Sequence, residues 1–299
     1  MMGFIKKSIR PFQPFFFRMF LFFLRIRKKK RFLILWNRGL GDIALGLYGL
    51  NQRIKEIIPD ASISYLTRKD LKEGFDLLQG CEVIVDPSME RKKPYNVSIK
   101  LRKQYDVIIE KPDPTYWLLD QLSRLVPNLT LPAQPIKKDR QIALHVSTET
   151  GQFYGYNKNW PEKNFRELIL KLNQQGIKPI LIGLQKNEVF NDLMVEDLRG
   201  EKGLIEILKE ILENCQTLIA PDSGILSLVY YLNHPIELNL ISFWSDPNQG
   251  ILKQNVPSPN PLLQHHYFIK NDLSKLSCET IFPFIQTGSS DAIKISSQR

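Results

Sequence analysis

The sequence predicts an α/β protein with two doubly wound halves. Three observations carry this prediction. Short, apolar, β-branched runs alternate with helical stretches along most of the chain, which is typical of parallel sheets built from βαβ units. Prolines gather near the middle, at Pro127, Pro132 and Pro135, where a linker is expected. The chain has 299 residues, which is enough for two domains of ordinary size.

The first half begins after Arg31 and is expected to form a Rossmann-like domain over residues 32–136. Its predicted strands are 32–36, 62–67, 82–86 and 106–110. Its predicted helices are 43–57, 70–78 and 114–126. The first two helices each lie between two strands, as the crossovers of a parallel sheet require.

The second half, residues 137–270, is expected to form a second Rossmann-like domain. Its predicted strands are 141–147, 177–184, 217–220 and 236–242, and its predicted helices are 162–175, 203–214 and 224–232. Pro161 suits the first turn of a helix, and Gly176 suits the position just after a helix. The remaining residues, 271–299, are expected to form a C-terminal helix and a disordered tail.

Residues 1–31 form a basic and aromatic segment. They contain ten Lys and Arg residues and no acid, whereas the whole chain contains 41 basic and 31 acidic residues. The rest of the chain is therefore formally neutral, and the net charge of +10 belongs to this segment. The segment also contains eight phenylalanines, among them Phe15, Phe16, Phe17, Phe20, Phe22 and Phe23, shortly before Lys28, Lys29 and Lys30.

An amphipathic helix in the membrane interface fits this composition best. Phenylalanine supplies apolar burial, and each Lys or Arg near anionic headgroups adds ~1 kcal/mol. Arg18 and Arg25 interrupt the apolar run, so it is too short to span a bilayer. A disordered basic tail or a nucleic-acid-binding arm is the alternative. Such arms rarely need eight phenylalanines, and we therefore expect no nucleic-acid partner.

The three cysteines, Cys81, Cys215 and Cys278, are far apart and form no CxxC pair. The sequence thus shows neither a disulfide framework nor a zinc knuckle, and a reducing cytosol is the expected compartment. The chain also contains no Asp-x-Asp motif, so we expect no metal site.

A glycine turn follows the first predicted strand. Gly39 and Gly41 allow a close backbone approach, Arg38 belongs to the same turn, and Asp42 follows at the start of a helix. The plain alternative for Asp42 is a helix N-cap, because Asp is a favoured capping residue. The turn is neither a Walker loop nor a dinucleotide-binding fingerprint, because no GK[ST] follows and Leu45 breaks the GxGxxG pattern.

Three further motifs lie in the second half. Lys158, before a helix, would reach a phosphate, and Glu188, expected on the helix after strand 177–184, would accept two ribose hydroxyls. The Asp222-Ser223-Gly224 motif joins a strand to a helix and would offer N–H groups and a hydroxyl to an anion. The alternatives are a solvated lysine, a surface acid and a capping residue. Together, at the ends of successive strands, the motifs indicate a pocket for a nucleotide diphosphate.

In this order, the motifs resemble those of glycosyltransferase family 9, the bacterial heptosyltransferases of lipopolysaccharide core biosynthesis. The matching motifs are Gly41-Asp42, Lys158 before Trp160-Pro161, Gly183 with Glu188, Asp222-Ser223-Gly224, and the Ser242–Gly250 segment, which resembles the family's Gly-Pro-Thr-Asp-Pro turn. The likeness covers roughly residues 32–250. It implies a GT-B fold, in which two Rossmann-like domains face each other across a cleft.

The resemblance implies an inverting, metal-independent transfer of a heptose-like sugar from a nucleotide-diphosphate donor, expected to be ADP-linked, to a lipid-linked saccharide of the bacterial envelope. Asp42 matches the family's general base. The acceptor-side loop is Arg38, Gly39 and Gly41, and the donor-binding positions are Lys158, Glu188, Asp222, Ser223, Gly224 and Ser227. Ser227 stands where the family usually has a histidine that helps to hold the donor phosphates.

This replacement leaves a second hypothesis open, in which the chain is a catalytically degenerate relative that acts as a binding or scaffold protein at the membrane. For either function, the segment of residues 1–31 is expected to hold the protein on the cytoplasmic face of the inner membrane. Anionic lipids and the lipid-linked acceptor are its expected partners there. No cofactor is expected besides the nucleotide-sugar.

Overall fold

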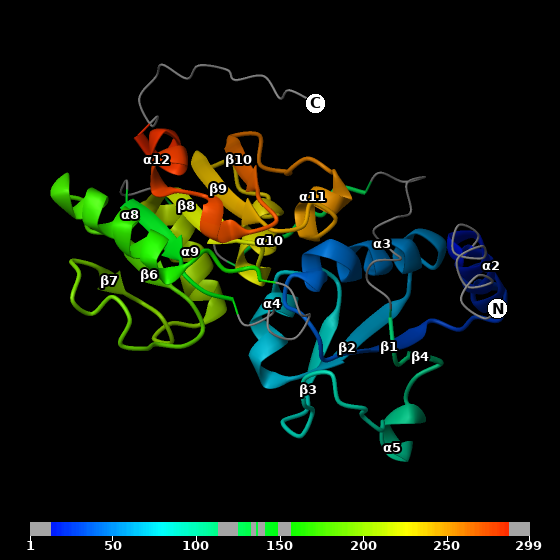
Figure 1. Ribbon diagram of the computed structural model, residues 1–299. Coiled ribbons are helices and arrows are strands. Elements are labelled where there is room, and N and C mark those ends of the chain that lie inside the picture. Colours follow the sequence, from blue (N-terminus) through cyan, green and yellow to red (C-terminus); the bar gives the residue numbers. More distant parts are fainter. Residues whose placement is uncertain (1–12, 113–124, 133–135, 137–140, 149–156, 287–299) are drawn as a thin grey trace, which may run out of the picture. The chain divides into compact units, whose positions relative to one another are not determined.

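The structure is a computed structural model that describes residues 13–112, 125–132, 136, 141–148 and 157–286. The chain divides into two compact units, whose sheets are seen in Figure 1. The first unit comprises Met1–Pro132 with two short returns of the chain, Tyr231–Asn233 and Gln254–Pro259. The second unit comprises Ala133–Tyr230, His234–Lys253 and Asn260–Arg299. The cleft expected between the halves stays a prediction.

The first unit is built on a parallel sheet of strand order β3-β2-β1-β4. Its strands are β1 (Arg31–Trp36), β2 (Ser62–Thr67), β3 (Glu82–Val85) and β4 (Val107–Ile109). The four strands predicted in the first half are therefore confirmed, with ends that differ by at most one residue. β1 lies in the centre and is buried from Phe32 to Trp36, so the turn that follows it begins inside the unit.

Helices and loops cover both faces of this sheet. On one face, the Tyr65 hydroxyl donates to Asn51 Oδ1 at 2.8 Å in α3 (Tyr48–Ile57). On the other face, the apolar side chains of Leu33, Leu35 and Leu66 pack with Leu101 of α5 (Ile99–Arg102). The helix predicted at 70–78 is shorter than expected, with η3 at Lys69–Leu71 and α4 at Lys72–Asp76. Most of the helix predicted at 114–126 lies outside the described residues.

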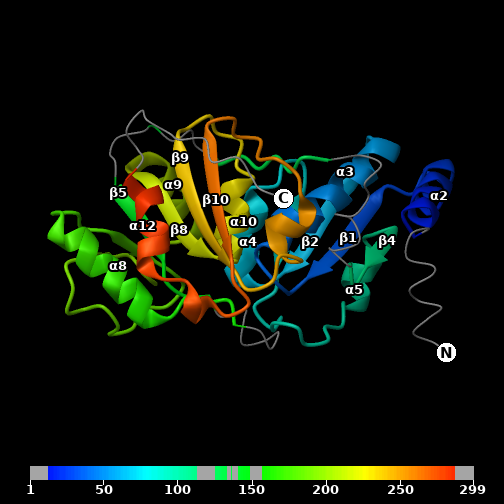
Figure 2. The ribbon, with the colours of Figure 1, turned by 45° about the horizontal axis from the view of Figure 1, so that its top comes forward.

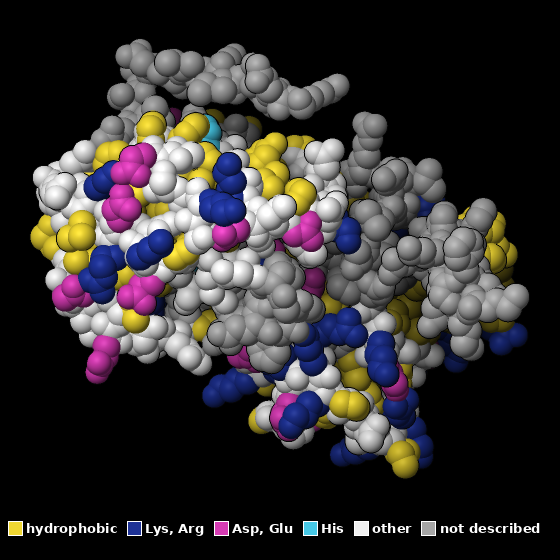
Figure 3. All heavy atoms as spheres, viewed as in Figure 1, with side chains coloured by type: hydrophobic (Ala, Val, Ile, Leu, Met, Phe, Trp, Pro, Cys, Tyr) yellow, Lys and Arg dark blue, Asp and Glu magenta, His cyan; other side chains and the backbone are white. Residues whose placement is uncertain are grey.

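Helix α2 (Gln13–Ile26) precedes the sheet and packs against α3. Leu21 and Leu24 are its buried side chains. The rest of the helix is rich in exposed apolar groups, part of which form the yellow area at the right edge of Figure 3: Phe15, Phe16, Met19, Phe20, Phe22, Phe23 and Ile26. Among the helices that the structure describes, none has the length and apolar character needed to cross a membrane.

The second unit is built on a parallel sheet of strand order β10-β9-β8-β5-β6-β7. Its strands are β5 (Gln141–His145), β6 (Ile180–Ile182), β7 (Glu196–Asp197), β8 (Cys215–Pro221), β9 (Leu238–Trp244) and β10 (Leu263–Ile269). The strand predicted at 177–184 is confirmed only in its centre, and the strand predicted at 236–242 begins and ends two residues later. Sequence reasoning missed β7 and β10.

Helices α8 (Glu162–Gln174) and α12 (Cys278–Gln286) pack side by side on one face of this sheet, and α9 (Leu204–Asn214) and α10 (Gly224–Tyr230) lie on the other face (Figure 2). Trp160, Phe165 and Phe243 form an aromatic core under α8. Two short elements complete the unit: α11 (Gly250–Gln254), whose last residue belongs to the first unit, and η4 (Leu273–Lys275).

Candidate active site

In the first unit, Asp42 follows a closed glycine turn at the end of β1. Trp36 Nε1 donates to the carbonyl of Gly39 at 3.0 Å and closes the turn. Asp42 then adopts helical backbone angles, φ −65° and ψ −16°, directly before the π-helical turn η2 (Ile43–Leu47). Its carboxylate accepts no capping hydrogen bond from that turn. The capping explanation is therefore not supported, and the Asp42 side chain is half-buried.

Gly39 and Asp42 are in direct contact. A Cβ atom on residue 39 would lie 2.7 Å from Asp42 Oδ2, which is closer than side-chain carbons approach other atoms. A side chain at position 39 would therefore displace the Asp42 carboxylate from its present place. The backbone of the predicted acceptor-side turn at Gly39 and the carboxylate of Asp42 therefore lie next to each other, and a change in one would move the other.

A basic cavity opens at the carboxyl ends of β2 and β3. It has a volume of about 550 Å³ and is lined by Arg68, Lys69, Asp70, Pro87, Met89, Glu90 and Arg91. Arg68 Nη2 donates to the carbonyl of Arg38 at 3.4 Å, which joins the cavity wall to the glycine turn. Burial lowers the pKa of the Lys92 ammonium, and the neighbouring charges of Arg91 and Arg38 lower it further. Cationic side chains therefore crowd this edge of the first sheet.

In the second unit, the ends of β5, β8 and β9 bring four polar side chains together. Lys158, from the loop before α8, places its Nζ 2.5 Å from Asp222 Oδ2. Both side chains are nearly buried, with 10% and 8% of their surface exposed. Burial raises the pKa of the Asp222 carboxyl, and the Lys158 charge opposes that rise. The predicted donor-side residues Lys158 and Asp222 are thus partners in one buried ion pair.

Gly250, at the end of the Ser242–Gly250 segment, packs against this ion pair. Its backbone has φ +46°, and a Cβ atom there would lie 2.7 Å from Asp222 Oδ1 and 2.9 Å from Trp244 Cη2. A side chain at position 250 would therefore displace the carboxylate or the indole. The segment that resembles the family's Gly-Pro-Thr-Asp-Pro turn thus lies against Asp222 Oδ1, while Lys158 contacts Asp222 Oδ2.

Sequence reasoning missed His145, which lies beside Ser223. His145 ends β5 and is buried, with its Nδ1 3.1 Å from Ser223 Oγ. The Ser223 hydroxyl oxygen also accepts the N–H of Leu226 at 3.1 Å, which fixes it at the start of α10. Burial lowers the pKa of His145 to about 4, so the ring is neutral near pH 7. Its signal in the sequence was its place at the end of a predicted strand, on the edge where the other motifs lie.

Two predicted donor-binding residues lie differently from the rest. Ser227 is 1% exposed, and its hydroxyl donates to the carbonyl of Ser223 at 3.1 Å within α10. Glu188 was expected on a helix, but it lies in a turn of the loop between β6 and β7 and is exposed. The helix prediction was wrong: the loop between the parallel strands β6 and β7 is irregular, and Arg199, just after β7, donates to its backbone carbonyls at Asn187 and Val189. The donor-binding roles of Ser227 and Glu188 stay predictions.

Among the described residues, no group of three or more His, Cys, Asp and Glu side chains lies close enough to hold a metal ion.

Comparison with known proteins supports the resemblance drawn from the motifs. Residues 119–236 match the sequence model of glycosyltransferase family 9 (heptosyltransferase). This part of the chain is thus similar in sequence to the family 9 glycosyltransferases. No curated protein sequence matches it.

Solved heptosyltransferases share the fold of this chain. ADP-heptose LPS heptosyltransferase II of E. coli is 15% identical, with a TM-score of 0.58 over 86% of this chain and 98% of that chain. E. coli heptosyltransferase WaaC with ADP-2-deoxy-2-fluoro heptose is 15% identical, with a TM-score of 0.51 over 87% of this chain and 100% of that chain. A family 9 glycosyltransferase from Veillonella parvula is 12% identical, with a TM-score of 0.54 over 86% and 96%. The α/β fold of the GT-B heptosyltransferases is therefore confirmed.

Proposed function

We propose that this protein is an inverting, metal-independent glycosyltransferase that moves a heptose-like sugar from an ADP-linked donor to a lipid-linked saccharide of the bacterial envelope. The observation that carries the proposal is the buried Lys158–Asp222 pair beside Ser223, at the strand ends of a unit whose sequence matches family 9. Two of the solved relatives are named for ADP-heptose or hold an ADP-heptose analogue, which supports ADP as the donor nucleotide.

The donor diphosphate needs positive charge and fixed hydrogen-bond donors as it leaves. Lys158 supplies the charge, and its ammonium already stands at a fixed point because Asp222 holds it. The Ser223 hydroxyl, fixed between His145 and the N–H of Leu226, adds a polar group beside it. A preorganised cation of this kind stabilises the developing charge without reorganising during the reaction.

Asp42 acts on the acceptor in this proposal. Its carboxylate takes the proton from an acceptor hydroxyl, and that oxygen forms a bond to the anomeric carbon of the donor. The bond from the anomeric carbon to the diphosphate breaks at the same time, so the configuration inverts. A positioned general base of this kind accelerates transfer about 10²- to 10⁴-fold.

The acceptor fits the basic cavity of the first unit. Arg68, Lys69 and Arg91 line it, and Asp70 and Glu90 are the acids in its wall. Asp70 is paired with Arg68 at 2.9 Å. This surplus of cationic groups favours a saccharide that carries carboxylates or phosphates.

Helix α2 attaches the protein to the inner membrane in this proposal. Its exposed Phe side chains would enter the headgroup region while Arg25, Arg27 and the following lysines attract anionic lipids. Leu21 and Leu24 are buried in the first unit, so the helix stays attached to the fold while its other face meets lipid.

The donor site is tested by nucleotide binding. ADP, UDP, GDP and CMP are each added to the wild-type protein and to Asp222→Asn, and the unfolding temperature is measured. A nucleotide at 100 times its Kd adds ~2.7 kcal/mol to the stability of the folded state. A shift with ADP that is absent in Asp222→Asn supports the proposed donor site. No shift with any nucleotide contradicts it and favours a degenerate relative.

Transfer and membrane attachment need separate tests. Asp42→Asn is expected to bind ADP like the wild type, but its rate of sugar transfer should fall about 10²- to 10⁴-fold. An Asp42→Asn variant with the wild-type rate would show that Asp42 is not the general base.

Membrane attachment is tested with the double variant Phe16→Ser, Phe22→Ser, which should bind less to vesicles containing anionic lipid and keep its fold intact. Deletion of residues 1–31 is the weaker test, because it removes the buried Leu21 and Leu24. Unchanged vesicle binding by the double variant would refute the anchor.

A further inference from the structure

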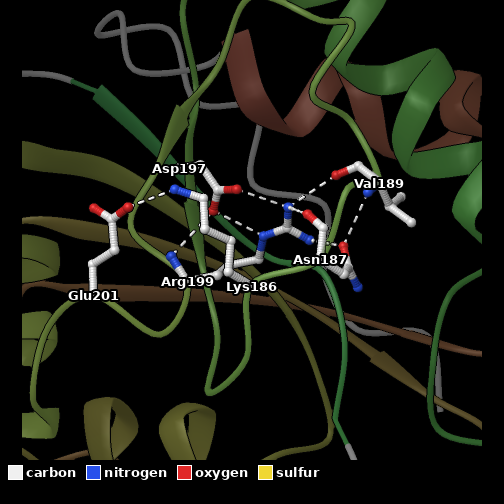
Figure 4. A network of polar contacts seen from close by, with 6 residues as sticks. All are labelled: Lys186, Asn187, Val189, Asp197, Arg199 and Glu201. Atoms are coloured by element: carbon white, nitrogen blue, oxygen red, sulfur yellow. Dashed lines mark hydrogen bonds and ion pairs between the residues drawn. The ribbon is translucent and has the colours of Figure 1, made fainter.

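A single buried arginine holds both residues that flank Glu188 (Figure 4). Arg199 is 1% exposed, and its Nη1 donates to Asn187 Oδ1 at 2.7 Å. Its Nη2 donates to the carbonyl of Asn187 at 3.0 Å and to the carbonyl of Val189 at 2.9 Å. The backbone immediately before and after Glu188 is therefore attached to one guanidinium.

The guanidinium is itself fixed by a carboxylate. Asp197 lies at the end of β7. Its Oδ1 accepts a hydrogen bond from Arg199 Nε at 2.8 Å, and its Oδ2 accepts one from Arg199 Nη2 at 2.8 Å. This two-pronged contact sets the plane of the guanidinium as well as its position. A lysine at position 199 would supply the positive charge, but it lacks the planar set of N–H donors with which the guanidinium contacts Asp197, Asn187 and Val189 at the same time.

The loop that carries Glu188 is closely packed against the strand end that carries Arg199. The N–H of Gly200 donates to the carbonyl of Gly183 at 3.0 Å, and Lys186 Nζ lies 2.5 Å from Glu201 Oε1. Gly200 has φ +69°, and a Cβ there would lie 3.3 Å from the Leu184 carbonyl. The two sides of the loop thus meet backbone to backbone.

The same loop contains a strained residue. Phe190 has φ +77°, in the left-handed region that residues other than glycine rarely adopt, and its ring is buried in the core of the second unit. The Arg199 guanidinium lies 5.9 Å from the centroid of that ring. Strain of this kind persists only where the surroundings hold the backbone, and the hydrogen bonds of Arg199 to Asn187 and Val189 do so here.

We propose that Arg199 is a positioning residue for Glu188: it fixes the loop so that the exposed Glu188 carboxylate meets the ribose hydroxyls of the donor nucleotide. The proposal rests on the proposed function, because it takes the donor to be a nucleotide and Glu188 to be its ribose ligand. Glu188 has no part in the Arg199 network itself, so the network orders the loop and leaves the carboxylate available to a ligand.

The test is the preference of the protein for ADP over 2′-deoxy-ADP, measured as the ratio of their Kd values by calorimetry. Hydrogen bonds from a ribose hydroxyl to a carboxylate make the wild-type ratio about 10 to 100. The variants are Glu188→Gln, Arg199→Lys and Asn187→Ala. Lys186→Met is the matched control, because Lys186 lies in the same loop but its ion pair with Glu201 is half-exposed on both sides, and such surface pairs add little to holding a loop. Pyrophosphate binding reports the anion site alone.

In Glu188→Gln, Arg199→Lys and Asn187→Ala, the ratio should fall at least about threefold while the Kd of pyrophosphate stays the same, and Lys186→Met should match the wild type. A wild-type ratio in Arg199→Lys and Asn187→Ala, with a reduced ratio in Glu188→Gln, overturns the role of Arg199 and leaves the proposed function standing. A wild-type ratio in Glu188→Gln removes Glu188 as the ribose ligand and overturns the inference. Failure of the wild type to bind ADP or pyrophosphate overturns the proposed function as well. Asn187→Ala keeps the test decisive if Arg199→Lys does not fold, because Asn187 is exposed.

Discussion

Lys158 Nζ lies 2.5 Å from Asp222 Oδ2, and both side chains are about nine-tenths buried. The two residues are 64 positions apart: Lys158 lies in the loop before α8, and Asp222 directly follows β8. A pair of this kind contributes little to stability by itself, because burying two charges costs about as much as their attraction returns. Its presence at the strand ends is therefore better explained by the ligand charge that it is placed to meet.

The first prediction concerns this ion pair. Asp222→Asn and Lys158→Met should each lower the free energy of unfolding by about 3 kcal/mol, because each leaves one buried charge without its partner. The double variant should recover part of that loss, since no charge remains. Denaturant unfolding of the three variants measures this. Single losses below about 1 kcal/mol would mean that water reaches the pair and that the site is open.

The second prediction concerns Gly250. Gly250→Ala should weaken ADP binding at least about tenfold, because the new Cβ would stand 2.7 Å from Asp222 Oδ1 and push it from Lys158. It should also lower the free energy of unfolding by about 1–3 kcal/mol. Gly176→Ala is the matched control: its φ is also positive, at +76°, but no atom lies within 4 Å of the added Cβ. Equal effects of both variants on ADP binding would contradict the contact with Asp222.

Much of the fold could be predicted because the local patterns agree with the tertiary structure. β1, β2 and β8 are apolar runs in the centres of parallel sheets, and periodicity identifies such runs well. Edge elements were harder to predict. β10 contains His265, His266 and Tyr267, so it reads as a polar stretch, and only its pairing with β9 makes it a strand.

The site could be predicted in part for a similar reason. Asp42 and Asp222 each follow a buried central strand, so their place at the strand ends could be read from the sequence. The contacts of Gly250 with Asp222 and of Arg199 with Asn187 depend on how loops return to the sheet. The local pattern of side chains does not show which distant segment a loop will contact. The irregular loop around Glu188 was therefore predicted as a helix.

The third prediction concerns Gly39. Gly39→Ala should lower kcat about tenfold or more and leave the Kd of ADP unchanged, because its Cβ would stand 2.7 Å from Asp42 Oδ2 and displace the carboxylate. Steady-state transfer assays with calorimetry of ADP binding separate the two effects. Gly80→Ala, in the same unit with φ +73° and no atom within 4 Å, controls for loss of stability. A normal kcat in Gly39→Ala would show that transfer does not depend on the place of this carboxylate.

The fourth prediction concerns His145. Burial holds its pKa near 4 in the folded protein, below the ordinary value of 6.5. The unfolded chain therefore binds a proton first as the pH falls, and the folded state loses up to about 3 kcal/mol between pH 6.5 and pH 4. His145→Gln should remove this share of the pH dependence. Burial also lowers the pKa of His265 to about 4, so His265 should cause a loss of stability of similar size over the same pH range. The free energy of unfolding, measured from about pH 7 to about pH 4.5, gives the slope of stability against pH for each protein. A slope in His145→Gln equal to that of the wild type would mean that the His145 ring is hydrated.

The last prediction concerns Asp106, which fastens the junction between α2 and β1. Its Oδ2 accepts the backbone N–H groups of Lys30 and Arg31 at 3.1 and 3.0 Å, and Lys29 Nζ lies 3.5 Å from Oδ1. The backbone N–H of Arg31, the Arg31 guanidinium and the backbone N–H of Lys30 hold the pKa of the Asp106 carboxyl well below its ordinary value of 3.8. The carboxylate therefore stabilises the fold above that pH, and the stabilisation is lost as the pH falls below it.

Asp106→Asn should accordingly lower the free energy of unfolding at pH 7 by about 1–3 kcal/mol, since the amide accepts weaker hydrogen bonds and carries no charge. The difference from the wild type should shrink as the pH falls toward about 2.5, because the carboxyl of the unfolded wild-type chain then takes up a proton that the folded protein does not, and this lowers the wild-type free energy of unfolding. Asp60→Asn is the matched control: Asp60 pairs with Lys30 at 3.3 Å but is 71% exposed, so its loss should change stability by no more than about 0.5 kcal/mol. Because α2 continues directly into this junction, a loosened Asp106→Asn junction should also reduce binding to anionic vesicles. Unchanged stability at pH 7 would show that the backbone N–H groups of Lys30 and Arg31 find equivalent acceptors in water.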